Sequence, residues 1–115
     1  MATQSFKDLP VWQQASNFAV DVYKSFSTCR DYGFRDQIQR AAISVPNNIA
    51  EGYARRSDKA LRNFLLIAKG SAAEVESMLL IAVRLDYIHP ELQTKLSSDI
   101  EEIGRQLSGF VKKLG

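Results

Sequence analysis

A chain of 115 residues predicts a single domain, residues 1–115, with a hydrophobic core of modest size. Its hydrophobic fraction of 45% and charged fraction of 24% are typical of a globular protein and exclude a disordered chain. The formal net charge of +2 is too small to indicate nucleic-acid binding by itself, so the distribution of the charge along the chain is more informative.

The first predicted helix begins near Pro10. Asp8, Leu9 and Pro10 offer a capping residue followed by a proline in the first turn. The apolar residues that follow have the three-and-four spacing of an amphipathic helix: Val11, Ala15, Phe18, Ala19, Val22, Tyr23 and Phe26. Polar and small residues over 27–33 predict that this helix ends there.

The second predicted helix contains a proline. Its buried face is expected to hold Phe34, Ile38, Ala41, Val45, Ile49 and Tyr53. Pro46 lies within this pattern, where it removes a backbone donor and crowds the carbonyl of Ala42. We therefore predict a kinked helix.

Two further helices complete the chain. Ser57 is a good N-cap for a third helix of roughly thirty residues that ends before Pro90. The fourth has apolar residues spaced almost in heptads: Leu92, Leu96, Ile100, Ile103, Leu107, Phe110 and Leu114. No segment has the sustained alternation of a strand. The sequence predicts an all-α fold, an antiparallel up-down-up-down four-helix bundle with a proline-kinked second helix.

Apolar residues outside the core faces indicate self-association. In the third helix, Ile67, Met78, Ile81 and Leu85 lie roughly 120° from the face that holds Leu61 and Leu79. In the second helix, Ile43, Ala50 and Ala54 also lie outside the core stripe. Because a helix that is apolar on several faces usually has a second partner, we expect a homo-oligomer. The alternative is that the third helix occupies the centre of its own bundle.

A polar stripe runs along the second helix beside its core face. It comprises Gln37, Arg40, Ser44, Asn48, Glu51 and Arg55, within roughly 80° of arc. We expect Asn47 and Asn48 to hydrogen-bond the backbone groups freed near Pro46. Arg40 and Glu51 are expected to pair with charges of a neighbouring helix, such as Lys69, Glu74 or Glu76. These contacts would make the stripe mainly architectural.

Two glycines within predicted helices indicate close packing. Gly52 and Gly70 each cost about 1 kcal/mol relative to alanine in a helix interior. We therefore expect that each of them allows two backbones to approach closely.

A basic corner is predicted between the second and third helices. Arg55 and Arg56 end one helix, and Lys59 and Arg62 begin the next. Such a cluster can neutralise nucleic-acid phosphates, and Tyr53 beside it could stack on an unpaired base. The alternative is an ordinary solvated corner with the tyrosine in the core.

The sequence has none of the familiar catalytic or metal-binding motifs. His89 is the only histidine, and there is no Glu-x-x-His pair, HExxH motif, CxxC pair or phosphate-binding glycine loop. Glu74 and Glu76 are two residues apart and point to different sides of a helix. We expect no catalytic residue, no metal site and no cofactor.

The expected location is the cytoplasm, without a membrane anchor. Cys29 is the only cysteine and cannot form an internal disulfide, which indicates a reducing compartment. The first ten residues lack the apolar run of a signal peptide. The longest apolar run, residues 78–83, is far too short to span a bilayer.

Three segments resemble the 23S rRNA intervening-sequence proteins. They are LPVWQQA (9–15), QIQRAAISVPNNIAEGYARRS (37–57) and FLLIAKGSAAEVE (64–76). The resemblance covers nearly the whole chain. It implies a bacterial cytoplasmic four-helix bundle whose relatives assemble into ring-like homopentamers, and whose biochemical function is largely unsettled.

Two functional hypotheses follow. The first is a non-enzymatic oligomeric protein that binds nucleic acid, RNA above all, through Arg55, Arg56, Lys59, Arg62 and Tyr53. The second is an assembly or adaptor protein whose polar stripe forms a subunit interface or binds a protein partner of unknown identity.

Overall fold

The computed structural model describes residues 5–115 and contains four long helices and one short turn of 3-10 helix. The elements are η1 (Phe6–Asp8), α1 (Pro10–Ser25), α2 (Tyr32–Ala54), α3 (Asp58–Arg84) and α4 (Pro90–Lys113). They form an elongated body of 49 × 21 × 20 Å. The prediction of an all-α four-helix bundle is confirmed.

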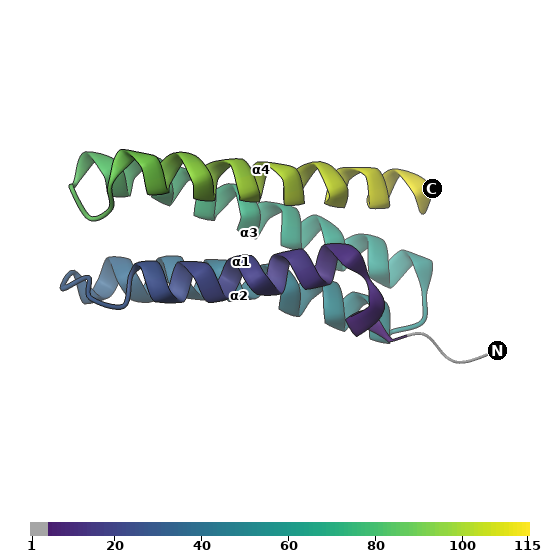
Figure 1. Cartoon of the computed structure of the whole chain (residues 1–115). Helices are drawn as coiled ribbons and strands as arrows, with labels where there is room; N and C mark the ends of the chain where they lie inside the picture. Colours follow the sequence, from purple (N-terminus) through teal and green to yellow (C-terminus); the bar gives the residue numbers. More distant parts are fainter. Residues whose placement is uncertain (1–4) are drawn as a thin grey trace.

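The helices surround one central core. The backbones of α1 and α2, α2 and α3, α3 and α4, and α4 and α1 approach closely, whereas within residues 5–115 those of the diagonal pairs do not. Figure 1 shows the α1–α2 and α3–α4 connections at one end of the body. The α2–α3 connection, η1 and the last turn of α4 lie at the other end. This arrangement determines which loops and helix ends can share a surface.

Side-chain caps mark the starts of η1, α2 and α3, whereas α1 and α4 begin without one. Ser57 caps α3 as predicted, since its hydroxyl accepts a hydrogen bond of 3.2 Å from the Ala60 N–H. Asp31 caps α2 through the Phe34 N–H, so α2 begins at Tyr32, within the segment predicted to be a break. The prediction for Asp8 was wrong. Its carboxylate accepts from the Ser5 N–H in a capping box that closes η1, and α1 follows Leu9 without a side-chain cap.

The core follows the predicted apolar spacing with a few shifts. Ile38, Ala41, Val45 and Ile49 of α2 are buried as predicted, together with Ala42, Pro46 and Gly52. Phe34 and Tyr53, near the two ends of α2, are only half-buried. Met78 was predicted to lie on a second apolar face of α3, but it is buried in the bundle core with 6% of its surface exposed.

The second helix continues through its proline. Pro46 is buried, and α2 is helical from Tyr32 to Ala54. The missing N–H of Pro46 removes the usual donor to the Ala42 carbonyl. The kink expected at this point stays a prediction.

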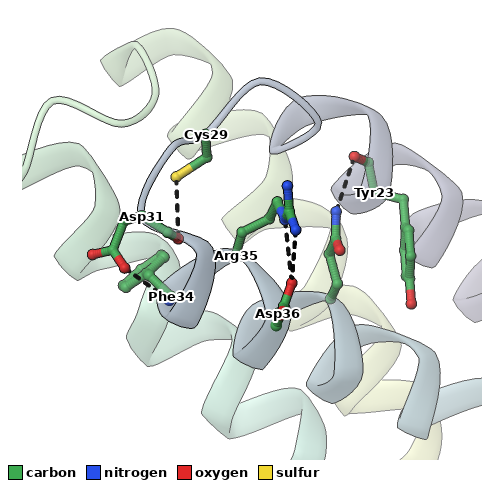
Figure 2. A network of polar contacts seen from close by, with 7 residues as sticks. Tyr23, Cys29, Asp31, Phe34, Arg35 and Asp36 are labelled. Carbon is green, nitrogen blue, oxygen red and sulfur yellow. Dashed lines mark hydrogen bonds and ion pairs between the residues drawn. The ribbon is translucent and has the colours of Figure 1, made fainter.

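A hydrogen-bonded tie joins the two connections at the end opposite the α2–α3 turn. Asp31 accepts bonds from the Tyr87 hydroxyl at 2.7 Å and from the Phe34 N–H at 3.1 Å. These two bonds lower the pKa of the Asp31 carboxyl, and the first also raises the pKa of Tyr87. Figure 2 shows Asp31 between Phe34 and the Cys29 thiol. The thiol donates to the Asp31 carbonyl at 3.8 Å, so Cys29 has a local structural contact.

The close approach expected at Gly52 is present, whereas the one expected at Gly70 is not. A Cβ on Gly52 would lie 2.7 Å from the Phe64 Cβ and 3.3 Å from the Leu61 Cα, both on α3. A Cβ on Gly70 would meet nothing within 4 Å, because this residue faces outward from α3. Gly52 therefore sets the spacing between α2 and α3, and Gly70 has no such role within the chain.

We predict that Gly52→Ala lowers the free energy of unfolding by about 1–3 kcal/mol, because the new methyl overlaps α3 backbone and side chain. Gly104→Ala is the matched control, since Gly104 lies in α4 with open space around it. It should raise the free energy of unfolding by about 0.5–1 kcal/mol. Urea denaturation followed by circular dichroism measures both, and equal effects would contradict the packing role of Gly52.

A pair of carboxyl groups faces across the contact between α3 and α4. Glu76 and Glu101 line one shallow groove together with Lys69 and Arg105. The hydrogen bond to Glu101, with partial burial as a smaller cause, raises the pKa of Glu76. Because its folded-state pKa lies above the unfolded one, the folded protein binds this proton more tightly than the unfolded chain.

We predict that the pair makes the bundle less stable as the pH rises from the ordinary glutamate range through the raised pKa of Glu76. Below that window both states hold the proton, and the stabilising hydrogen bond between the two carboxyl groups is fully present. Above it, the two ionised groups repel each other in the folded state. Glu101→Gln should remove this part of the pH dependence, whereas Glu91→Gln, at the start of α4, should leave it. Urea titrations across the window that give identical slopes for Glu101→Gln and wild type would contradict the prediction.

Candidate functional site

A three-residue turn brings the predicted basic residues to one corner. Arg55 is the C-cap of α2, and Arg56 and Ser57 complete the connection to α3. Lys59 and Arg62 follow in the first turns of α3, next to Asp58. Since no longer loop intervenes, the bundle backbone itself positions all four cations.

Arg55 has partners inside the chain. Its guanidinium is 2.9 Å from a Glu51 carboxylate oxygen, one turn earlier on α2. Its Cζ also lies 5.0 Å from the centroid of the Phe64 ring on α3, in a cation–π contact. Arg55 therefore packs across the α2–α3 contact, and Glu51 offsets much of its charge.

The other three cations of the corner are exposed and unpaired. Arg56, Lys59 and Arg62 form no ion pair with any residue in the range 5–115. Arg56 has a φ of 58°, in the left-handed region, at the position after a helix where glycine is usual. A side chain in this conformation costs roughly 1–2 kcal/mol. The chain thus carries a strained arginine where a glycine would fit more easily.

The fold adds lysines that sequence reasoning missed. Lys7 of η1 and Lys112 and Lys113 of the last turn of α4 are exposed at the same end as the α2–α3 turn (Figure 1). The expected topology could have located these lysines, because the fourth helix of such a bundle ends at the same end as the second connection. We define the basic end as Lys7, Arg55, Arg56, Lys59, Arg62, Lys112 and Lys113. Asp8, Glu51 and Asp58 are the acidic side chains close to them in the sequence.

The side chain of Tyr53 is less exposed than base stacking would require. Its side chain is half-buried and packs against the core, and it interacts with other residues of the chain. The position of Tyr53 therefore agrees with the alternative prediction, in which the tyrosine belongs to the core beside a solvated corner.

Much of the polar stripe ties α2 to α3 or to itself. The Ser44 and Ser71 hydroxyls are 2.9 Å apart, and the Gln37 amide donates to Glu74 at 3.3 Å. Asn48 donates to the Ser44 carbonyl at 2.8 Å and to its hydroxyl at 2.9 Å. The expected local role of Asn48 is thus present, although its acceptor is Ser44 and not the Ala42 carbonyl freed by the proline.

Three expectations for the stripe were wrong. Asn47 is exposed and makes no hydrogen bond within the described chain. Glu51 pairs with Arg55 on its own helix, because the one-turn spacing already brings the two groups together. Arg40 is exposed without an ion pair among residues 5–115, in a shallow groove between α2 and α3.

Two apolar surfaces are exposed on the sides of the bundle. The outer face of α3 carries Leu66, Ile67, Leu80, Ile81 and Leu85, each between 44% and 53% exposed. Gly70, Ala73 and Ser77 lie between these large residues on the same face. The second surface is a groove between α1 and α2, lined in part by Trp12, Val20, Tyr23, Ile43 and Pro46. Patches of this kind mark contact sites more often than free surface.

The described residues contain no obvious site for metal chemistry. In the range 5–115, no three His, Cys, Asp or Glu side chains gather as metal ligands would. No helix in that range combines the length and hydropathy needed to cross a membrane.

Comparison with known proteins places the chain in a family. No functionally curated protein is detectably similar to it. A crystal structure of a protein of unknown function from the S23 ribosomal protein family of Bacteroides thetaiotaomicron has the same fold, with a TM-score of 0.83 and 27% identity over 89% of this chain and 95% of that one. The family model of the 23S rRNA-intervening sequence protein matches residues 7–109. The chain therefore belongs to the 23S rRNA-intervening sequence protein family.

Proposed function

We propose that this protein is a non-enzymatic nucleic-acid-binding protein that contacts phosphates through its basic end. The observation that carries the proposal is the exposed set of Arg56, Lys59 and Arg62, which form no ion pair within residues 5–115, extended by the lysines at the end of α4. Each phosphate that a cation neutralises releases condensed counterions, which favours binding at low salt. RNA is the first ligand to test, because the family is named after 23S rRNA.

Arg56 supports the proposal through its conformation. A glycine at this position would relieve left-handed strain, yet the chain has a long cationic side chain there. Arg56→Gly therefore separates stability from binding: the free energy of unfolding should increase by about 0.5–1 kcal/mol while the affinity for RNA decreases.

The second candidate function is assembly, as a self-associating or adaptor protein in the cytoplasm. The observation that favours it is the exposed apolar face of α3, more than the polar stripe, since Ser44, Asn48 and Glu51 are already bonded within the chain. The α3 face and the α1–α2 groove involve different helices, so a head-to-tail contact between copies fits them better than a self-complementary one. Arg40 and Gln37 would border such a contact on α2. A closed ring of five copies is the form that the family resemblance implies.

We predict that RNA affinity decreases steeply with salt and depends on the basic end. Each lost phosphate contact should reduce the slope of log K against log salt by about 1. Arg56→Glu should therefore weaken binding on the order of tenfold at about 50 mM salt. Fluorescence anisotropy with labelled RNA measures both effects.

Arg30→Glu is the matched control for this prediction. Arg30 is also an exposed arginine in a connection between helices, but it lies at the opposite end of the bundle. Its reversal should leave the affinity within about twofold of wild type. Equal losses from the two variants would show that net charge alone matters, and no binding at low salt would reject the proposed function.

We predict that the protein in solution has a mass that is a multiple of 12.9 kDa, and five times that mass for the pentamer. Ile67→Glu with Ile81→Glu should yield monomers of unchanged helix content, because two charges would be buried at the subunit contact. Ser98→Glu, on the exposed side of α4, is the control and should leave the mass unchanged. Light scattering after size exclusion measures the mass, and a wild-type monomer at micromolar concentration would contradict the prediction.

A further inference from the structure

The aromatic side chains around the basic end are covered. Proteins that bind single strands stack the exposed bases on open aromatic rings, whereas a duplex hides its bases and is held through its phosphates and groove shape. Tyr53, Phe64 and Phe110 are half-buried and lie near the α2–α3 turn or the end of α4. Tyr53 and Phe110 pack against the core, and one face of Phe64 is occupied by the Arg55 guanidinium at 5.0 Å.

The remaining aromatic residues do not supply a stacking surface there either. Phe6 and Trp12 are half-buried and pack edge to face, with ring centroids 5.2 Å apart. The exposed aromatic side chains among the described residues are Tyr23 and Tyr32, at 41% and 60%. Both flank the α1–α2 connection, at the opposite end of the molecule (Figure 1). One face of the Tyr32 ring is occupied by the Arg35 guanidinium at 4.8 Å, and both tyrosines are separated from the cations of the basic end by most of the length of the bundle.

The basic end is wide enough to face more phosphates on a duplex than on a single strand. The cross-section of the bundle is 21 × 20 Å, and its exposed cations come from η1, the α2–α3 turn and α4. A duplex stretch of about 20 Å carries about 12 phosphates, because its charges are about 1.7 Å apart along the axis. A single strand of the same length carries about half as many. A group of cations spread over this width therefore releases more counterions when it binds a duplex than when it binds a single strand.

We propose that the basic end binds double-stranded nucleic acid in preference to single strands, through phosphates and independently of sequence. This inference rests on the proposed function and specifies its ligand. Arg56, Lys59 and Arg62 would contact one backbone, and Lys112 and Lys113 would extend the contact across the end of the bundle. Arg55 would contribute less to the contact, because its guanidinium is already held by Glu51 and Phe64.

The test compares one sequence in two forms with the full-length protein. The probes are a labelled duplex of about 20 base pairs and its unstructured single strand, as RNA and as DNA, at about 50 and 200 mM salt. We expect the duplex to bind at least about fivefold more tightly than the strand at low salt, and a scrambled duplex to bind equally well. Single strands that bind as tightly as the duplex, or a scrambled duplex that binds more weakly, would overturn the inference while leaving the proposed function intact. Absence of binding to every probe would reject both.

Two variants locate the contact. Lys112→Glu with Lys113→Glu should reduce duplex affinity more than single-strand affinity, since these lysines widen the surface and belong to a different helix from the corner. Tyr53→Leu, which removes the ring and keeps an apolar side chain against the core, should change neither affinity. A selective loss of single-strand binding in Tyr53→Leu would point to stacking of bases on this residue and would contradict the duplex preference.

Discussion

The contact between α2 and α3 at Gly52 is the constraint on which the rest of the molecule depends. Gly52 has no side chain that would overlap Phe64, so the two helices can approach closely there. They are joined by only three residues. The same approach brings the Phe64 ring beneath Arg55 and lets the Ser44 and Ser71 hydroxyls meet. The missing Cβ of Gly52 thus permits the close approach of α2 and α3 at the turn that carries the cations.

The two ends of the bundle have different chemistry. At one end, Asp31 and Tyr87 form a tie between connections, with Phe34 and Cys29 packed beside it. At the other end, most of the exposed charged side chains are lysine and arginine, and among the described residues Arg55 is the one of them that forms an ion pair. The apolar surfaces lie on the long sides, on α3 and between α1 and α2. Copies that associate through their sides would therefore leave the basic ends accessible, and a cyclic arrangement would place all of them on one face.

The sequence predicted the positions of the helices more accurately than the contacts that individual side chains make between them. The three-and-four spacing located the four helices, and Ser57 located the start of α3, because these signals are local. Met78 and Gly70 were misjudged because their surroundings depend on how α3 is rotated in the bundle. Glu51 was misjudged because a partner one turn away was closer than any on another helix. Lys7, Lys112 and Lys113 could have been found from the expected topology, whereas the burial of Tyr53 depends on packing that no spacing reveals.

The shortness of the α2–α3 turn has a consequence for recognition. Its backbone is fixed on both sides by helices that pack along their length, and the Ser57 cap and the Tyr53 carbonyl hold the residues between them. A partner that binds there would find the backbone already ordered and would have to immobilise only the outer parts of the side chains. Association should then proceed with little loss of main-chain entropy, and its rate should be determined by electrostatic attraction more than by folding.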